Sequence, residues 1–349
     1  MDHNGKAVWS DEPSNADCYR KSYVDGLEAY VSRMNKEKKA ARESFMPPER
    51  LVKNAEEYRA TYRSMIGIRK YTELPHVERE AVGEDGYSYI YRLKVFIEDE
   101  VPFYAMLLLP KGVNKKVPLV IFQHGGGGTP ELAADFYGKN NYNKAVRRFC
   151  ERGCAILMPQ LLIWSTTEIE TQRAHDIPYD RNNLDTAFKR FGQSITGFEI
   201  SAIIRCLDYA LTLPMIDSEK IAMSGLSYGG YFTLYTMAAD TRIKAGYASC
   251  AFNDRDVYPR SDWTYQNSAS LFQDAEVAAL CAPRKLVIEV GKVDPVFNYE
   301  SAVTEIPRVK PYFEAWGVPD NFRFNLHNGA HTFTDTDEYF DFIINSLEE

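Results

Sequence analysis

The fold is decided by residues 223–230, MSGLSYGG, which lie between a predicted strand at Lys220–Met223 and a predicted helix at Tyr231–Ala239. A sharp turn from a strand into a helix leaves no room for side chains beside its central residue, so glycines fit on either side of it. Such a turn exposes the Ser227 hydroxyl and aims a helix N-terminus at charge that develops beside it. The alternative is a glycine-rich loop with an incidental serine, but the place between strand and helix favours a nucleophile.

Strands and helices alternate on both sides of this turn. The run Val117–Phe122 is apolar throughout, as expected of a strand buried on both faces. A strand of alternating polarity, Tyr87–Glu98, and a second strand, Val101–Leu109, precede it and are separated by a two-residue turn. The pattern predicts an α/β fold with a mostly parallel central sheet flanked by helices. Further strands are predicted at 154–158, 243–251, 286–290 and 321–326, and helices at 143–152, 197–213, 301–316 and 338–347.

Residues 1–75 differ from the rest in their pattern of apolar and charged residues. Tyr23–Met34 and Pro48–Met65 carry apolar residues at helical spacing, with lysines and arginines between them. We therefore expect an N-terminal helical lead packed on the main domain, and one catalytic α/β domain over residues 76–349.

Composition excludes several classes of function. The 349 residues carry a formal net charge of −8, which disfavours nucleic acid as a partner. We see neither the apolar core of a signal peptide nor a membrane-spanning stretch, so we expect no membrane partner. Six cysteines are too sparse for a disulfide scaffold in a chain of this length. The expected location is the cytoplasm.

A serine hydroxyl needs a base, and the order that follows such a turn is an acid and then a histidine. Asp294 lies on the loop after the strand 286–290, and His331 lies on the loop after the strand 321–326. His327 falls at the end of that strand, whereas His331 lies beyond a glycine on a loop that is free to reach the serine. The alternatives are a turn aspartate before a proline and a solvated loop histidine.

A glycine run, Gly125–Gly128, follows the buried strand 117–122. Glycines let the backbone approach a ligand and point N–H groups at it, as an oxyanion hole requires. Phosphate binding is the competing interpretation, but no Lys-Ser or Lys-Thr follows, and Pro130 occupies the last position of a G-x-G-x-x-G started at Gly125. His124 is expected to order this loop rather than to transfer protons.

Together these motifs resemble the α/β-hydrolase superfamily, and more closely its dienelactone-hydrolase-like and acetyl-xylan-esterase-like bacterial branch. The resemblance covers about residues 78–349. It implies the α/β-hydrolase fold, a triad of Ser227, Asp294 and His331, and an acyl-enzyme route to ester hydrolysis without metal or organic cofactor. It also implies oxyanion contacts from Gly125, Gly126 and Tyr228. True dienelactone hydrolases have a cysteine nucleophile, so the serine favours ester hydrolysis.

Two long segments without predicted structure, 160–196 and 253–272, are expected at the edge of the site. Their aromatic residues Trp164, Tyr258 and Trp263 either bind a sugar or acyl group or pack the loops onto the body. We expect a small-molecule ester substrate, with an acyl ester on a carbohydrate as the hypothesis. The alternatives are a peptidase or acyl-aminopeptidase and a non-catalytic binding protein on this fold. The lead helices are also candidates for self-association into a homo-oligomer.

Overall fold

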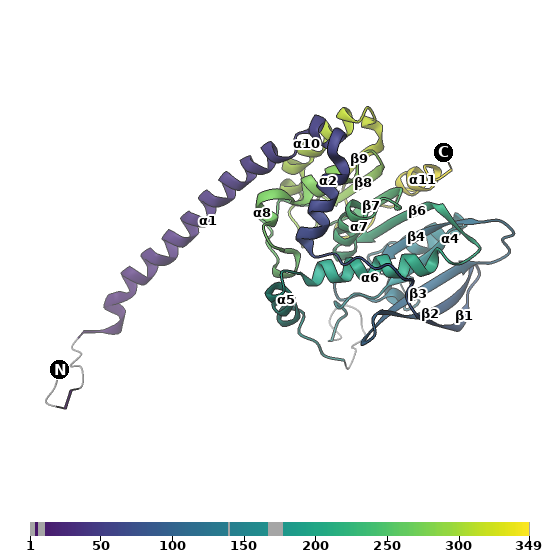
Figure 1. Ribbon diagram of the computed structural model, residues 1–349, viewed down its shortest axis with the longest axis horizontal. Helices are drawn as coiled ribbons and strands as arrows, with labels where there is room; N and C mark the ends of the chain where they lie inside the picture. The colour runs from purple at the N-terminus through teal and green to yellow at the C-terminus, as the bar shows by residue number, and fades with distance from the viewer. Residues whose placement is uncertain (1–3, 6–10, 139, 167–176, 349) are drawn as a thin grey trace.

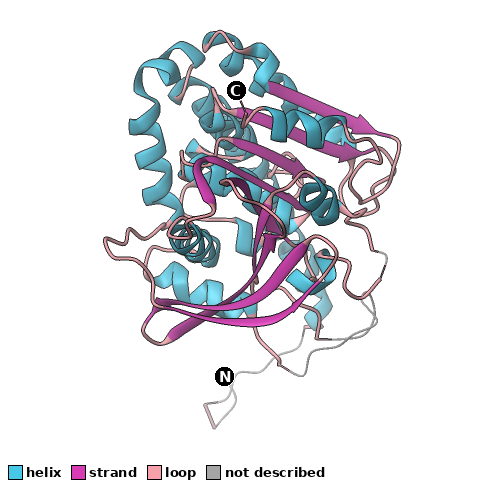
Figure 2. Ribbon diagram, turned by 90° about the vertical axis from the view of Figure 1, so that its right-hand side faces the viewer, coloured by secondary structure: helices cyan, strands magenta, loops and turns pink. Residues whose placement is uncertain are grey.

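The computed structural model describes residues 4–5, 11–138, 140–166 and 177–348, and these residues form a single twisted sheet with helices on both faces (Figures 1 and 2). Its strand order is β1-β2-β3-β5-β4-β6-β7-β8-β9. The neighbouring strands β1-β2, β2-β3 and β3-β5 pair antiparallel, at one side of the sheet. The remaining neighbours, β5-β4, β4-β6, β6-β7, β7-β8 and β8-β9, pair parallel. The strands are β1 Val77–Glu84, β2 Ser88–Glu98, β3 Val101–Pro110, β4 Val117–Gln123, β5 Ala155–Pro159, β6 Ile216–Leu226, β7 Ala245–Ser249, β8 Lys285–Gly291 and β9 Phe322–His327.

Two apolar layers enclose the sheet. One layer holds α2, α6, α7, α9 and α10, and the other holds α4 and α11, where Phe149 and Phe340 are fully buried. The α-helices are α1 Asp17–Phe45, α2 Pro48–Ile66, α3 Pro130–Ala133, α4 Ala145–Glu151, α5 Arg181–Arg190, α6 Ile195–Ala210, α7 Tyr228–Ala239, α8 Ser268–Leu271, α9 Asp274–Cys281, α10 Tyr299–Ala315 and α11 Glu338–Asn345.

The predicted α/β fold is confirmed. The antiparallel pair is β2 and β3, with Ser88 opposite Pro110, and it precedes the parallel part as expected. The strand β1 was not predicted, because its side chains are almost all exposed and show no clear alternation of polarity. The segment 160–196 is not irregular throughout, because α5 lies within it. This helix has few apolar residues, so the sequence shows no helical periodicity that would predict it.

The predicted helical lead consists of α1 and α2, and the two helices behave differently. α2 packs on the body, with Leu51, Tyr62 and Ile66 fully buried. α1 joins the body only near its C-terminal end, where Arg42 is buried, and its N-terminal part projects away from the domain (Figure 1). The expectation of a lead packed on the main domain therefore describes α2 but not the first half of α1.

None of the helices in the described part of the chain is both long and apolar enough to cross a bilayer.

Candidate active site

Ser227 lies between β6 and α7 in a backbone conformation that few residues adopt. Its φ is 60° and its ψ is −119°, and a non-glycine residue is held there only by its surroundings. A Cβ on Gly225 would come within 2.6 Å of the Gln123 carbonyl oxygen, and a Cβ on Gly229 would overlap that oxygen. The strand-to-helix turn predicted from residues 223–230 is therefore present, and its glycines have the expected steric reason.

Asp294 and His331 meet although they come from the loops after two different strands. His331 Nδ1 lies 2.7 Å from Asp294 Oδ2. Asp294 Oδ1 accepts the N–H groups of Val296 and Phe297 at 2.7 and 3.1 Å. Burial opposes ionisation of this carboxyl, but the hydrogen bonds outweigh it, so the pKa of Asp294 is lowered. A carboxylate at Nδ1 fixes the imidazole tautomer and leaves Nε2 free to accept a proton.

The choice between the two downstream histidines follows from their contacts. His327 Nδ1 accepts the N–H of Gly329 at 3.0 Å, and its Nε2 is buried without a hydrogen-bond partner among the described residues. His331, by contrast, faces the carboxylate. The two loops can approach because residue 291 is glycine, since a Cβ there would overlap the Ala330 carbonyl oxygen.

Cys250 lies beside this pair, and its sulfur is within 4.8 Å of ligand atoms of Asp294 and His331. Such a group has the spacing of a metal site. Burial raises the pKa of the Cys250 thiol to about 12, and the Asp294 carboxylate is already held by His331 and two backbone N–H groups. The chemistry therefore fits an aspartate–histidine pair better than a metal centre, and the expectation that no metal is needed stays a prediction.

His124 orders the glycine loop from inside the protein. Its Nδ1 faces the Gly125 carbonyl oxygen at 2.9 Å, and its Nε2 accepts the N–H of Leu161 at 3.0 Å. Burial lowers the pKa of His124 from its ordinary value of 6.5 to about 4. The imidazole is therefore neutral near pH 7, with Nδ1 protonated, and ties two loops together.

The glycine loop lies directly against the turn that carries the serine. A Cβ on Gly125 would be 3.3 Å from the Ser227 Cβ, and a Cβ on Gly126 would be 3.1 Å from the Tyr228 ring. The N–H of Gly125 donates to Tyr142 Oη at 2.6 Å. An oxyanion at that N–H would share it with the tyrosine, whereas Gly126 and Tyr228 contribute N–H groups from the loop and from the first turn of α7. These oxyanion contacts stay predictions.

Ser227, His331 and the glycine loop border one pocket of about 600 Å³. This volume is within the usual range for a small-molecule site. The Arg260 guanidinium lies 5.1 Å from the ring centres of both Tyr228 and Trp263. The rim is polar, and the pocket lining includes Ser227, His331, Gly126, Asn140, Asn141 and Arg260.

The three aromatic residues predicted to bind substrate make packing contacts. Trp263 is 3% exposed and stacks on Tyr231 at 4.4 Å. Tyr258 Oη accepts the N–H of Asn298, and Trp164 Nε1 donates to the Ile177 carbonyl. None of the three is among the described residues that line the pocket. Their contacts are those of the packing alternative, and a role in substrate binding stays a prediction.

Sequence reasoning missed a buried ionic network beneath the site. Arg181 makes two hydrogen bonds to Glu199, at 2.9 and 2.7 Å, and one of 2.7 Å to Asp262. Tyr228 Oη donates to the same Asp262 carboxylate at 2.9 Å. The network fixes the ring of Tyr228, which follows Ser227 in the chain. Arg181 and Asp262 are 81 residues apart, so no local pattern could have indicated the pair.

Comparison with known proteins places these features in context. Residues 187–299 match the model of the prolyl oligopeptidase family. The acetyl esterase Axe7A of Xylanibacter ruminicola is 26% identical over 234 residues, which cover 66% of this chain and 48% of that protein. The chain therefore spans about half the length of this curated relative.

Solved structures of similar shape extend over most of the chain. A putative acetyl xylan esterase from Bacteroides fragilis superposes with a TM-score of 0.67 and 18% identity, covering 84% of this chain and 83% of that one. A glucuronoyl esterase from Solibacter usitatus gives 0.62 and 13%, covering 85% and 93%. The chain thus has the α/β-hydrolase fold and is similar in sequence and shape to proteins of the acetyl-xylan-esterase type.

Proposed function

We propose that the protein is a serine esterase that cleaves acyl esters carried on carbohydrates or similar small molecules. The observation that carries this proposal is the 2.7 Å contact between His331 Nδ1 and Asp294, in a pocket that the same histidine shares with Ser227. Serine, aspartate and histidine, in this order along the chain, are the parts of the α/β-hydrolase mechanism.

The proposed reaction has two halves. His331 Nε2 takes the Ser227 proton as Oγ attacks the ester carbonyl, and the backbone N–H groups of Gly126 and Tyr228 stabilise the oxyanion. Collapse breaks the bond to the alcohol, which leaves with the proton held by His331. Water then gives a proton to His331 and attacks the acyl-enzyme, and the serine leaves with that proton as the carboxylic acid is released.

The substrate class rests on the pocket rim and on the relatives. Asn141 and Arg260 present an amide oxygen and a guanidinium at the pocket, which suit the hydroxyls of a sugar. The Asn140 amide is held by Leu132 and Tyr142. The similar proteins are named as acetyl, acetyl xylan and glucuronoyl esterases. These features best support a small ester substrate whose alcohol part is polar.

Hydrolysis of a p-nitrophenyl ester series, from acetate to octanoate, tests the chemistry in the wild type and in Ser227→Ala. We expect wild-type turnover that disappears in the variant, and a chain-length profile that favours short acyl groups. Activity that survives in Ser227→Ala would mean a different nucleophile. Turnover of simple esters without any release of acetate from acetylated sugars would refute the carbohydrate part.

A peptidase is the second candidate, because the prolyl oligopeptidase family model matches the segment that carries the turn. Amino-acid anilides decide between the two classes: cleavage that depends on Ser227 and exceeds ester turnover would favour the peptidase. No turnover of either substrate class would favour a non-catalytic binding protein.

We also propose a cytoplasmic location. All six cysteines are free, and five of them are buried, as expected of thiols that serve as small apolar side chains. Fractionation of the native host, followed by detection of the protein, tests this.

A further inference from the structure

The N-terminal half of α1 carries an apolar stripe that nothing in the described part of the chain covers. Tyr19 is 77% exposed, Tyr23 70% and Tyr30 53%, and Leu27 and Val31 are about half exposed. Their spacing places them on one side of the helix. At roughly 150–250 Å² for a whole aromatic side chain, the three tyrosines alone expose on the order of 300–500 Å². An area of this size equals that of the largest apolar patch on a typical monomer, and such patches are often functional.

The stripe continues the face by which α1 joins the body. Met34 and Phe45 lie on the same side of the helix and are partly buried, and Arg42, near them, is fully buried. α1 therefore presents one continuous face that packs on its own domain at one end and is bare at the other (Figure 1). Gly26 lies in the bare part, where glycine weakens an isolated helix. A helix of this kind gains most of its stability from packing.

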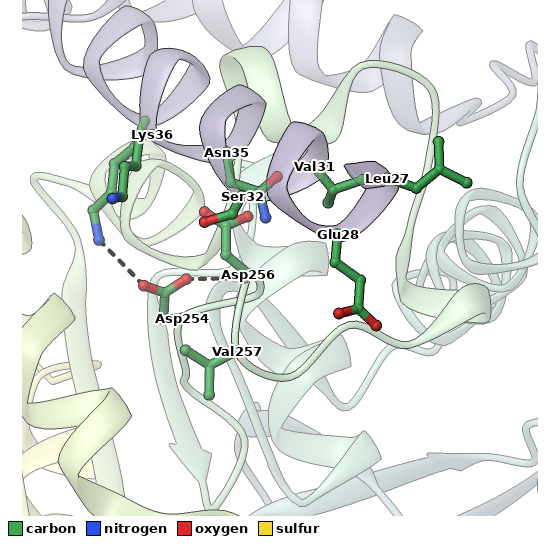
Figure 3. Close-up of a pocket in the computed structure, with 10 residues that line it drawn as sticks. Leu27, Glu28, Val31, Ser32, Asn35, Lys36, Asp254, Asp256 and Val257 are labelled. Atoms are coloured by element: carbon green, nitrogen blue, oxygen red, sulfur yellow. Dashed lines mark hydrogen bonds and ion pairs between the residues drawn. The ribbon is translucent and has the colours of Figure 1, made fainter. Parts of the chain in front are cut away.

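A groove of about 610 Å³ runs between α1 and the loop that carries Asp254, Asp256 and Val257 (Figure 3). Leu27 and Val31 form its apolar border on the helix, and Val257, 60% exposed, lies on the loop.

Charge in the groove favours a basic segment. Three carboxylates border it, those of Glu28, Asp254 and Asp256, against two ammonium groups, those of Lys36 and Lys39. Asp254 binds Lys39, whereas Glu28 has no ion-pair partner among the described residues. Arg20, on the same helix, lies on the side of the apolar stripe.

We propose that a second copy of this chain covers the stripe, with the two α1 helices antiparallel about a two-fold axis near Leu27. The charges select this orientation. Residues 17–28 carry three acidic and two basic side chains, whereas residues 33–39 carry four basic and one acidic, so a parallel pair would place the basic halves together. In the antiparallel pair, Arg20 of one copy lies beside the other copy's groove and its carboxylates.

The area is adequate for a specific dimer. Twenty residues of helix span about 30 Å, so each copy reaches past the axis to the loop of its partner. Two sets of tyrosines, with the aliphatic residues between them, approach the roughly 1,200 Å² at which stable interfaces begin. An antiparallel pair also gives an isologous, closed assembly, so no stripe stays exposed to bind further copies.

The test is the mass in solution of the full chain and of two matched variants, by light scattering and sedimentation. We expect the wild type to have twice the mass of one chain at micromolar concentration. Leu27→Glu should lower that mass to one chain, because it places a charge at the centre of the stripe. Ala29→Glu adds the same charge on the opposite side of the helix and should leave the dimer intact. A wild type that is monomeric, or a Leu27→Glu variant that stays dimeric, would overturn the proposal.

Cross-linking tests the orientation. In a Cys18→Ser background, Leu27→Cys should form a disulfide between copies. Tyr19→Cys should not, because antiparallel helices place the two copies of residue 19 far apart. A cross-link at both positions would show a parallel pair and refute the orientation.

Binding to lipid vesicles tests the alternative that a lipid surface, and not a second copy, covers the stripe. Monomeric wild type that binds vesicles of phosphatidylserine and phosphatidylcholine, with binding lost in Leu27→Glu, would assign the stripe to a lipid surface and overturn the proposal. Mass is measured without substrate, so failure of the dimer leaves the esterase proposal untouched, and failure of the esterase leaves the dimer untouched.

Discussion

His124 makes the stability of the glycine loop depend on pH, and the effect can be worked out from its surroundings. The folded imidazole has a pKa lowered by burial to about 4 from an ordinary value of 6.5. Between these two values the unfolded chain binds a proton that the folded chain does not. The stability that the neutral imidazole contributes is therefore present above about pH 6.5 and is lost as the pH falls toward 4.

The size of the effect follows from the same numbers. A pH of 5 is about 1.5 units below the pKa of the imidazole in the unfolded chain. Each unit is worth about 1.36 kcal/mol, so the free energy of unfolding falls by about 2 kcal/mol relative to neutral pH. Protonation would also remove the acceptor for the N–H of Leu161. Other groups titrate in this range, so the measurement has to be a difference between variants.

The assay is urea denaturation at pH 7 and pH 5 for the wild type and for His124→Gln. The amide keeps a donor and an acceptor but does not titrate, so the loss of stability between the two pH values should be smaller in the variant by about 2 kcal/mol. His76→Gln is the control for replacement of a histidine as such, because this side chain is exposed in the folded chain. An equal loss in wild type and His124→Gln would refute the reasoning.

Three further predictions concern the site. Asp294→Asn should lower kcat for p-nitrophenyl acetate by about 10³–10⁴-fold with little change in KM, because it removes the charge that orients His331; a change below tenfold would contradict the role. Gly229→Ala should destabilise the fold by about 1–3 kcal/mol, since its Cβ meets the Gln123 carbonyl, and an unchanged melting temperature would contradict the steric argument. Arg181→Met should cost about 3–5 kcal/mol, because two buried carboxylates lose their partner; urea denaturation measures it, and a loss under 1 kcal/mol would contradict the network.

Local patterns predicted the parallel sheet and the positions of Ser227, Asp294 and His331, because each of these residues follows a strand whose apolar run is visible in the sequence. The strand ends of a parallel sheet meet at one edge, so the order of motifs along the chain carries over to their order in space. That is why three residues spread over more than 100 positions could be assigned to one site.

Other features depend on contacts that no local pattern encodes. Tyr142 reaches the N–H of Gly125, and Arg181 reaches Asp262, only because separate loops converge. The helix α5 was missed because it has few apolar residues. Its one leucine, Leu184, is 43% exposed in the fold. The apolar stripe of α1 was visible, but a stripe has the same spacing whether its own domain covers it or leaves it bare.

The docking of α2 bears on how the chain folds as it is synthesised. Arg59 donates to the carbonyl oxygens of Leu280 and Ala282, and Tyr62 Oη donates to that of Tyr235. These partners leave the ribosome more than 150 residues after the helix itself. At roughly 5–20 residues per second, the apolar face of α2 waits on the order of 10–40 seconds for the surface it will bury. A helix made early is thus among the last elements to reach its place, and a nascent chain must keep this amphipathic helix from aggregating until most of the domain exists.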